Sequence, residues 1–257
     1  MSALTLHAAG ELVWEALAPA LPGFTVEIVP EIDSTNTELM RRARAGQTAP
    51  VLLVAQRQTA GRGRLGREWD SQAQQEGGAL TFSLGLELAP ADWSGLSLAV
   101  GLAVAEALHP DIVLKWPNDL WIQGRKLAGI LIETATVGTQ RYAVIGVGIN
   151  IAPRSAAGLR TPPAWLQELQ PQWTAAEVLV RVAPGLLQRV QQCCAQGFGA
   201  LRAAYHARDY FYGKEVVCTD GLCGQARGVD AQGALLVLTA QGLQKINSSE
   251  VSVRAPD

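Results

Sequence analysis

The sequence predicts an α+β fold: a mixed, mainly antiparallel sheet with helices, followed by a small C-terminal β-barrel of the SH3-like kind. Apolar runs bounded by turn-forming residues recur before residue 150, but the repeated strand–helix alternation of a parallel sheet is missing. After Phe211 the pattern changes to short strands separated by Gly and Asp. We therefore expect one large domain over residues 1–210 and a second over residues 211–257.

The first expected elements are a short helix, a strand and a second helix. A weak helical pattern at residues 11–21 is interrupted by proline, and an apolar strand follows at residues 24–30. Thr35 and Glu38 fit a capping box that begins a helix. The polar residues 33–38 serve either this helix start alone or a polar ligand as well, because a helix N-terminus presents unpaired N–H groups.

An arginine- and glycine-rich segment, residues 58–69, follows the apolar strand 51–55. Glycine lets the backbone approach a ligand closely, and arginine offers paired donors that match phosphate or carboxylate. We interpret the segment as a loop that closes over an anionic substrate, with a solvated turn or a nonspecific nucleic-acid patch as alternatives. Its glycines also fit G-x-G-x-x-G, but residues 68–78 lack the apolar helical face that a dinucleotide site requires.

The rest of the large domain is expected to alternate between strands and helices without a regular repeat. A strand at residues 79–88 precedes a helix at residues 91–108 that opens near Asp92. Gln123 and Gly124 separate two strands as a hairpin turn. The other expected strands are 112–116, 119–122, 125–134 and 142–149, and helices at 175–195 and 198–207 follow a proline-rich loop at 151–173.

Three of these strands contain, or end next to, residues that are unusual in the core of a sheet. The sequence Lys-Trp-Pro-Asn-Asp at residues 115–119 is either a surface turn or a strand edge that faces a cavity. Lys126 begins a nearly continuous apolar run, so its ammonium group points into a pocket or lies at the rim of the sheet. Glycines within residues 146–150 predict that something packs against bare backbone there.

Composition excludes several classes of protein. Lys+Arg number 21 against Asp+Glu 23, a net charge of −2, so specific nucleic-acid binding is not expected. The most apolar stretch, residues 96–108, is too short to span a membrane, and residues 1–40 lack the basic residues of a signal peptide. The four cysteines lack zinc or redox spacing and are interpreted as reduced thiols of a cytoplasmic protein.

Taken together, these segments resemble the biotin protein ligases, in the order in which that family carries them. The resemblance spans residues 33–150, and the C-terminal domain matches by position. The motifs are Asp33-Ser34-Thr35-Asn36, Gln58 with Gly61-Arg62-Gly63-Arg64-Leu65-Gly66-Arg67 and Trp69, Lys115-Trp116-Pro117-Asn118-Asp119, Arg125-Lys126-Leu127-Ala128-Gly129-Ile130-Leu131, and Gly146-Val147-Gly148-Ile149-Asn150.

The resemblance implies a catalytic domain of the class II synthetase type and a two-step ligase. Biotin and ATP, with Mg²⁺, would form biotinyl-5′-AMP, and a lysine of the biotin carboxyl carrier protein of acetyl-CoA carboxylase would then take the biotinyl group. Lys126 and Arg62 would be catalytic. Biotin would contact Ser34, Thr35, Asn36, Gln58, Arg62, Gly63, Arg64, Lys126, Gly129 and Gly148. ATP would contact Arg62, Arg64, Arg67, Trp69, Lys115, Asn118 and Asn150.

Two departures from the family pattern bear on these expectations. Residues 72–78 stand where the family has a short Ser-Pro-Gly-like turn, so loop closure is expected to differ. The short segment before the first strand leaves no room for a DNA-binding domain, which favours the single-function enzyme. The protein is expected to be a monomer or a homodimer, and the sequence assigns no metal ligands. Two alternative functions stay open: a lipoate-type acyl ligase and a nonenzymatic biotin-sensing regulator.

Overall fold

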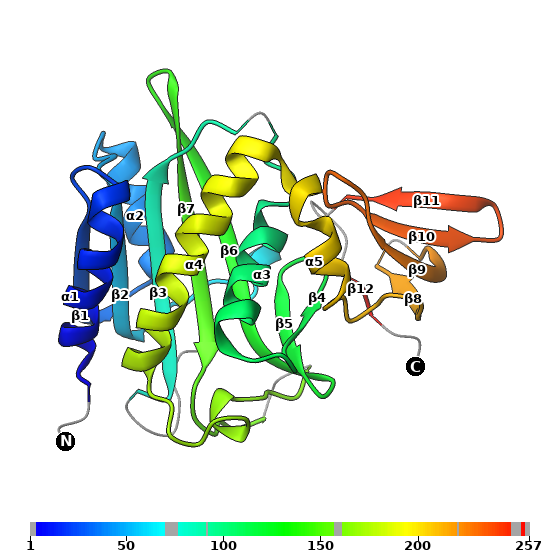
Figure 1. Cartoon of the computed structure of the whole chain (residues 1–257), viewed down its shortest axis with the longest axis horizontal. Helices are drawn as coiled ribbons and strands as arrows, with labels where there is room; N and C mark the ends of the chain where they lie inside the picture. Colours follow the sequence, from blue (N-terminus) through cyan, green and yellow to red (C-terminus); the bar gives the residue numbers. More distant parts are fainter. Residues whose placement is uncertain are drawn as a thin grey trace.

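The computed structural model describes residues 4–69, 77–90, 92–156, 161–219, 221–247 and 253–254. These residues form two sheets and the helices that pack on them (Figure 1). The first sheet has seven strands in the order β1-β2-β3-β7-β6-β5-β4, in which β1 and β2 are parallel and the other pairs are antiparallel. Its strands are β1 (Thr25–Ile32), β2 (Val51–Gln58), β3 (Ala79–Glu87), β4 (Val113–Lys115), β5 (Asp119–Ile122), β6 (Arg125–Val137) and β7 (Gln140–Asn150).

Helices cover both faces of this sheet. One face carries the main hydrophobic core, to which three long helices contribute, and the opposite face carries α2 over a smaller cluster that includes Leu39 and Leu53 (Figure 1). Because both faces are covered, β3 is buried along almost its whole length. The helices are α1 (Leu6–Leu17), α2 (Thr35–Arg44), α3 (Leu96–Leu108), α4 (Ala175–Gln196) and α5 (Arg202–His206).

Three helix starts differ from the sequence-based expectations. α1 begins earlier than predicted, because the Thr5 side chain caps it by accepting a hydrogen bond from the Ala8 N–H. α2 is capped by Ser34 instead of Thr35, whose hydroxyl is engaged in a tertiary contact. α3 begins after Gly95, which adopts φ 77°. The predicted capping box and the helix start at Asp92 are therefore wrong.

The C-terminal sheet has five antiparallel strands in the order β11-β10-β9-β8-β12. Among the described residues β11 and β12 are its two edges, so the expected closure into a barrel is not seen, although a separate antiparallel β-unit is confirmed. A boundary between residues 210 and 211 stays a prediction. The strands are β8 (Glu215–Cys218), β9 (Cys223–Val229), β10 (Leu235–Thr239), β11 (Gly242–Ile246) and β12 (Val253–Arg254).

The two sheets are joined through the edge strand β4. The Leu114 N–H donates to the Arg208 carbonyl at 2.7 Å, and the Tyr210 N–H donates to the Leu114 carbonyl at 2.9 Å. Residues 208–210 therefore extend the first sheet at β4, and the buried Trp116 indole donates to the Gly233 carbonyl of the second unit at 3.1 Å. The C-terminal unit is thus fixed beside the end of β4.

This junction contains a half-buried residue, Asp209, whose carboxylate Oδ2 atom is itself buried. Its Oδ1 accepts a hydrogen bond from the Phe211 N–H at 2.9 Å, whereas Oδ2 has no hydrogen-bond partner among the described residues. Burial raises the pKa of Asp209 from 3.8 to about 6. A carboxyl group whose pKa is raised by folding contributes stability below its unfolded pKa, and that stability is lost as the pH rises through the folded value.

Asp209→Asn should therefore raise the free energy of unfolding at pH 8 by up to ~3 kcal/mol, and by about half as much at pH 5. Urea titrations at the two pH values measure this difference. Asp111→Asn is the matched control, because the Asp111 side chain is 69% exposed. An equal gain at both pH values would show that Asp209 is not the titrating group.

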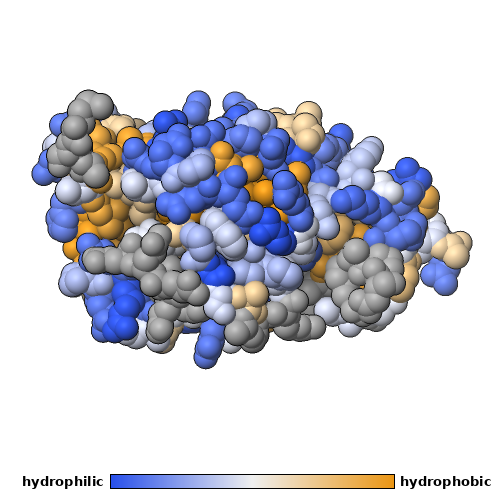
Figure 2. All heavy atoms as spheres, turned by 90° about the horizontal axis from the view of Figure 1, so that it is seen from below, coloured by the Kyte–Doolittle hydropathy of each residue, from blue (hydrophilic) through white to orange (hydrophobic). Residues whose placement is uncertain are grey.

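None of the described helices is long and apolar enough to cross a lipid bilayer. On the face drawn in Figure 2, hydrophobic residues appear in groups among hydrophilic ones.

Candidate functional site

The segments singled out in the sequence meet around one cavity on the α2 side of the first sheet. All but one of the predicted site residues line it, although they come from five separate parts of the chain. The lining includes Ser34, Thr35, Asn36, Gln58, Arg62, Gly63, Arg64, Arg67, Trp69, Lys115, Asn118, Lys126, Gly129 and Gly148. Asn150 lies outside this lining, with its Nδ2 donating to the Ala164 carbonyl at 2.9 Å and the Lys126 carbonyl at 3.3 Å.

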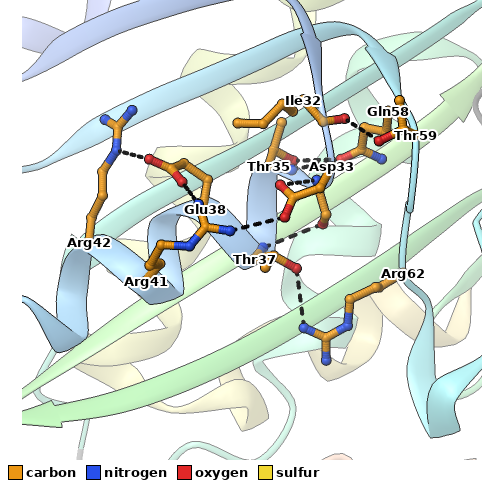
Figure 3. Close-up of polar contacts among 11 residues, drawn as sticks. Ile32, Asp33, Thr35, Thr37, Glu38, Arg41, Arg42, Gln58, Thr59 and Arg62 are labelled. Carbon is orange, nitrogen blue, oxygen red and sulfur yellow. Dashed lines mark hydrogen bonds and ion pairs between the residues drawn. The ribbon is translucent and has the colours of Figure 1, made fainter.

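The start of α2 forms a buried polar wall of the cavity. Thr35 donates both its N–H and its hydroxyl to Gln58 Oε1, at 2.8 and 3.1 Å (Figure 3). Ser83 Oγ lies 2.7 Å from Thr35 Oγ1 and 2.6 Å from Asn36 Oδ1. These side chains are at most 7% exposed, so the network fixes their orientation before a ligand arrives.

Asn36 extends this network to the sheet. Its Nδ2 donates to the Leu131 carbonyl at 3.2 Å and to Glu133 Oε2 at 3.0 Å. A Cβ atom at Gly146 would collide with Asn36 Oδ1, which explains why bare backbone is needed on β7 at this point. Two polar partners of Asn36, Ser83 and Glu133, were not predicted from the sequence. They lie on β3 and β6, and only the register of these strands brings their side chains to α2.

The arginine–glycine segment, residues 58–69, folds back on itself over the cavity. The Trp69 N–H donates to the Gly61 carbonyl at 2.9 Å, and the Gly63 N–H donates to the Arg67 carbonyl at 2.7 Å. Arg62 connects this loop to the sheet by an ion pair with Glu133 at 3.0 Å, and it donates to Thr37 Oγ1 at 3.4 Å (Figure 3). Residues 70–76, which hold most of the departure at 72–78, lie outside the described residues.

The indole of Trp69 lies against two glycines that pair across β6 and β7. Gly129 and Gly148 are register partners. A Cβ atom at Gly148 would come within 2.7 Å of Trp69 Nε1 and closer still to the ring carbons, and one at Gly129 would lie 3.5 Å from Cζ3. The glycine pair therefore provides a flat floor, and the indole of Trp69 lies on it.

Cationic side chains surround the opposite side of the cavity. The Lys126 ammonium lies 2.7 Å from Asp119 Oδ1 and 5.9 Å from the centre of the Trp69 ring. Arg64 donates to Asn118 Oδ1 at 3.3 Å, and burial lowers the pKa of Arg64. Burial also lowers the pKa of Lys115. This concentration of positive charge in a partly buried site suits a ligand that carries several negative charges.

The backbone of Lys126 is hydrogen-bonded to the loop that precedes α4. Its N–H donates to the Pro162 carbonyl at 3.0 Å, and its carbonyl accepts from the Ala164 N–H at 2.8 Å. The proline-rich loop therefore fixes the strand from which this ammonium group projects. Val253 of β12 also lines the cavity, which places the C-terminal unit at the site; no motif of the sequence indicated this contact.

Comparisons with known proteins agree with this site. Residues 28–150 match the biotin/lipoate A/B protein ligase family, and residues 212–254 match the biotin protein ligase C terminal domain. The biotin–[acetyl-CoA-carboxylase] ligase of Paracoccus denitrificans is 36% identical over 85% of this chain and 96% of its own length. The corresponding ligase of Mycobacterium tuberculosis is 36% identical over 82% of each chain.

Among solved structures, the biotin protein ligase from Aquifex aeolicus in complex with biotin and ATP has a TM-score of 0.76 and 31% identity. It covers 90% of this chain and 99% of its own. The identities and the shared architecture confirm the family that the sequence motifs indicated. The chain therefore belongs to the biotin protein ligases.

Proposed function

We propose that the chain activates biotin with ATP as biotinyl-5′-AMP and transfers the biotinyl group to a lysine of a biotin carboxyl carrier protein. The single observation that carries this proposal is the cavity in which a folded arginine loop, Lys115 and Lys126 face a preorganised polar wall at the start of α2. The family relationship and the biotin and ATP of the Aquifex aeolicus structure support it. The acetyl-CoA carboxylase carrier in the cytoplasm is the partner we propose.

The first step joins two anions. A carboxylate oxygen of biotin attacks the α-phosphorus of ATP, and the bond to pyrophosphate breaks. Dense positive charge lowers the repulsion and stabilises the charge that develops on the phosphoryl oxygens. In the second step the neutral amine of the carrier lysine attacks the acyl carbon, AMP leaves, and the amine loses a proton.

The polar wall, together with the Trp69 indole that lies on the glycine floor, suits biotin, which is small, neutral at its ring end and anionic at its tail. We propose that the network of Thr35, Asn36 and Gln58 faces the ring end. Lys126 then lies between the biotin carboxylate and the α-phosphate, where exchange of its Asp119 partner for the ligand would keep the ammonium paired. Arg64, Arg67 and Lys115 remain for the phosphates of ATP, and Asn150 stays a predicted contact on the adenine side.

Magnesium belongs to this proposal as the partner of the ATP phosphates. Carboxylate and amide oxygens suit Mg²⁺, and Asp119 and Asn118 offer them in the lining of the cavity. When bound, the ion would neutralise phosphate charge during the displacement.

Mass spectrometry of a reaction with ATP, Mg²⁺ and either biotin or lipoate tests the proposed function. The expected result is a biotinyl-AMP ester with biotin and a much smaller yield with lipoate, followed by mass addition to a single carrier lysine when a carrier is supplied. Ester formation with lipoate alone would indicate the lipoate-type ligase. Binding of biotin without ester formation would indicate a sensor.

Arg62→Gly should make the loop release biotinyl-5′-AMP roughly tenfold faster, because it removes the ties to Glu133 and Thr37. The escaped adenylate should then label lysines of a bystander protein such as serum albumin. Arg57→Ala is the matched control, since Arg57 pairs with Glu31 outside the cavity. Unchanged release and no bystander labelling would mean that Arg62 does not hold the loop closed.

A further inference from the structure

Lys115 is directed by the register of the hairpin that contains it. It is the last residue of β4, and Val113, two residues earlier on the same face, pairs with Trp121 of β5. Lys115 and Trp121 are therefore diagonal neighbours, which long side chains can bridge. The Lys115 ammonium lies 4.5 Å from the centre of the indole ring, within the range of a cation–π interaction.

A second aromatic ring reaches Lys115 from the C-terminal side of the chain. The pairing of residues 208–210 with Leu114 places Phe211 beside the end of β4. The Phe211 ring is fully buried, and its centre lies 5.6 Å from the Lys115 ammonium. Tyr210 joins the two rings, with ring centres 5.0 Å from Trp121 and 5.2 Å from Phe211.

The two lysines of the cavity differ in their partners. The Lys126 ammonium is paired with Asp119 at 2.7 Å, whereas the Lys115 ammonium has no hydrogen bond or ion pair within the described part of the chain. The aromatic rings orient the Lys115 ammonium without neutralising it. A cation held in this way is free to receive a charged ligand without first breaking a salt bridge.

We propose that Phe211 and Trp121 are positioning residues that hold the Lys115 ammonium ready for a phosphate group of the nucleotide. This inference rests on the proposed function, and it assigns to the junction with the C-terminal unit a role in nucleotide binding. The rings act through Lys115 and do not touch the reacting atoms.

Phe211→Leu and Trp121→Leu each keep an apolar side chain but remove one ring. Each should raise the KM for ATP roughly fivefold to tenfold in adenylate formation, while the KM for biotin changes less than twofold. Phe198→Leu is the matched control, because Phe198 is likewise buried, at 2% exposed, and lies outside the Lys115 contacts. Thermal unfolding of each variant shows whether it folds. If one of Phe211→Leu and Trp121→Leu does not fold, the other serves as the test.

Two further variants separate positioning from general packing. Phe211→Tyr keeps a ring and should restore the KM for ATP to within twofold of the original protein. In a Lys115→Ala background, Phe211→Leu should have no further effect on this KM. The inference is overturned if the effect of Phe211→Leu persists in that background, or if Phe198→Leu raises the KM for ATP equally. A parent protein that forms no adenylate would refute the proposed function instead.

Discussion

Lys126→Ala is expected to lower the rate of biotinyl-5′-AMP formation about 10³-fold. Removing one preorganised donor from a site that stabilises developing charge typically costs 10²–10³ in rate. Lys126 should reach the upper end, because we propose that it touches both the carboxylate and the α-phosphate. The measurement is single-turnover formation of the AMP ester, with saturating biotin and ATP.

Lys245→Ala is the matched control for this variant. Lys245 is also ion-paired with an aspartate, Asp230 at 2.8 Å, but it lies on β11, in the C-terminal sheet. Lys126→Ala also leaves Asp119 without its lysine partner, so Lys126→Ala combined with Asp119→Asn tests whether the free carboxylate contributes to the loss. Turnover by Lys126→Ala within tenfold of the original protein would remove Lys126 from its proposed role.

The strand pattern of the first domain could be predicted because its turns are encoded locally. Gln123 and Gly124 adopt φ 48° and 76°, a geometry that the predicted hairpin turn requires, and β5 and β6 follow as expected. Helix starts were less predictable, because neighbouring side chains compete to cap the helix and tertiary contacts can take up one of them. The Thr35 hydroxyl fits a cap in sequence, but in the fold it bonds to Gln58, and Ser34 caps the helix instead.

The site was predictable where a motif carries its chemistry within a few residues. Lys115, Lys126 and the arginine loop were identified in this way, and they line one cavity. Glu133 was missed because it is a single acidic residue directly after the apolar run 127–132 of β6. Its role appears only when register brings it to Asn36 and Arg62. Contacts of this kind depend on how distant segments pack, which local patterns do not record.

Gly148→Ala is expected to raise the KM for biotin roughly 30-fold, in keeping with the cost of overpacking a tight contact. The added methyl group would occupy the space of the Trp69 ring, which lies against this glycine. The ring can escape only by lifting from the floor formed with Gly129, and the loop that carries Trp69 must then move. Biotin titration of the initial rate, with the KM for ATP measured alongside, tests this expectation.

Gly129→Ala provides the matched comparison, because it adds the same methyl group to the register partner of Gly148. Its nearest neighbour would be the flexible end of Lys126 at 3.3 Å, so the KM for biotin should rise less than tenfold. If the clash with the indole is the cause, Gly148→Ala should have no further effect once Trp69→Ala has removed the ring. A large additional loss in that double variant would instead mean that the methyl group at residue 148 obstructs biotin directly.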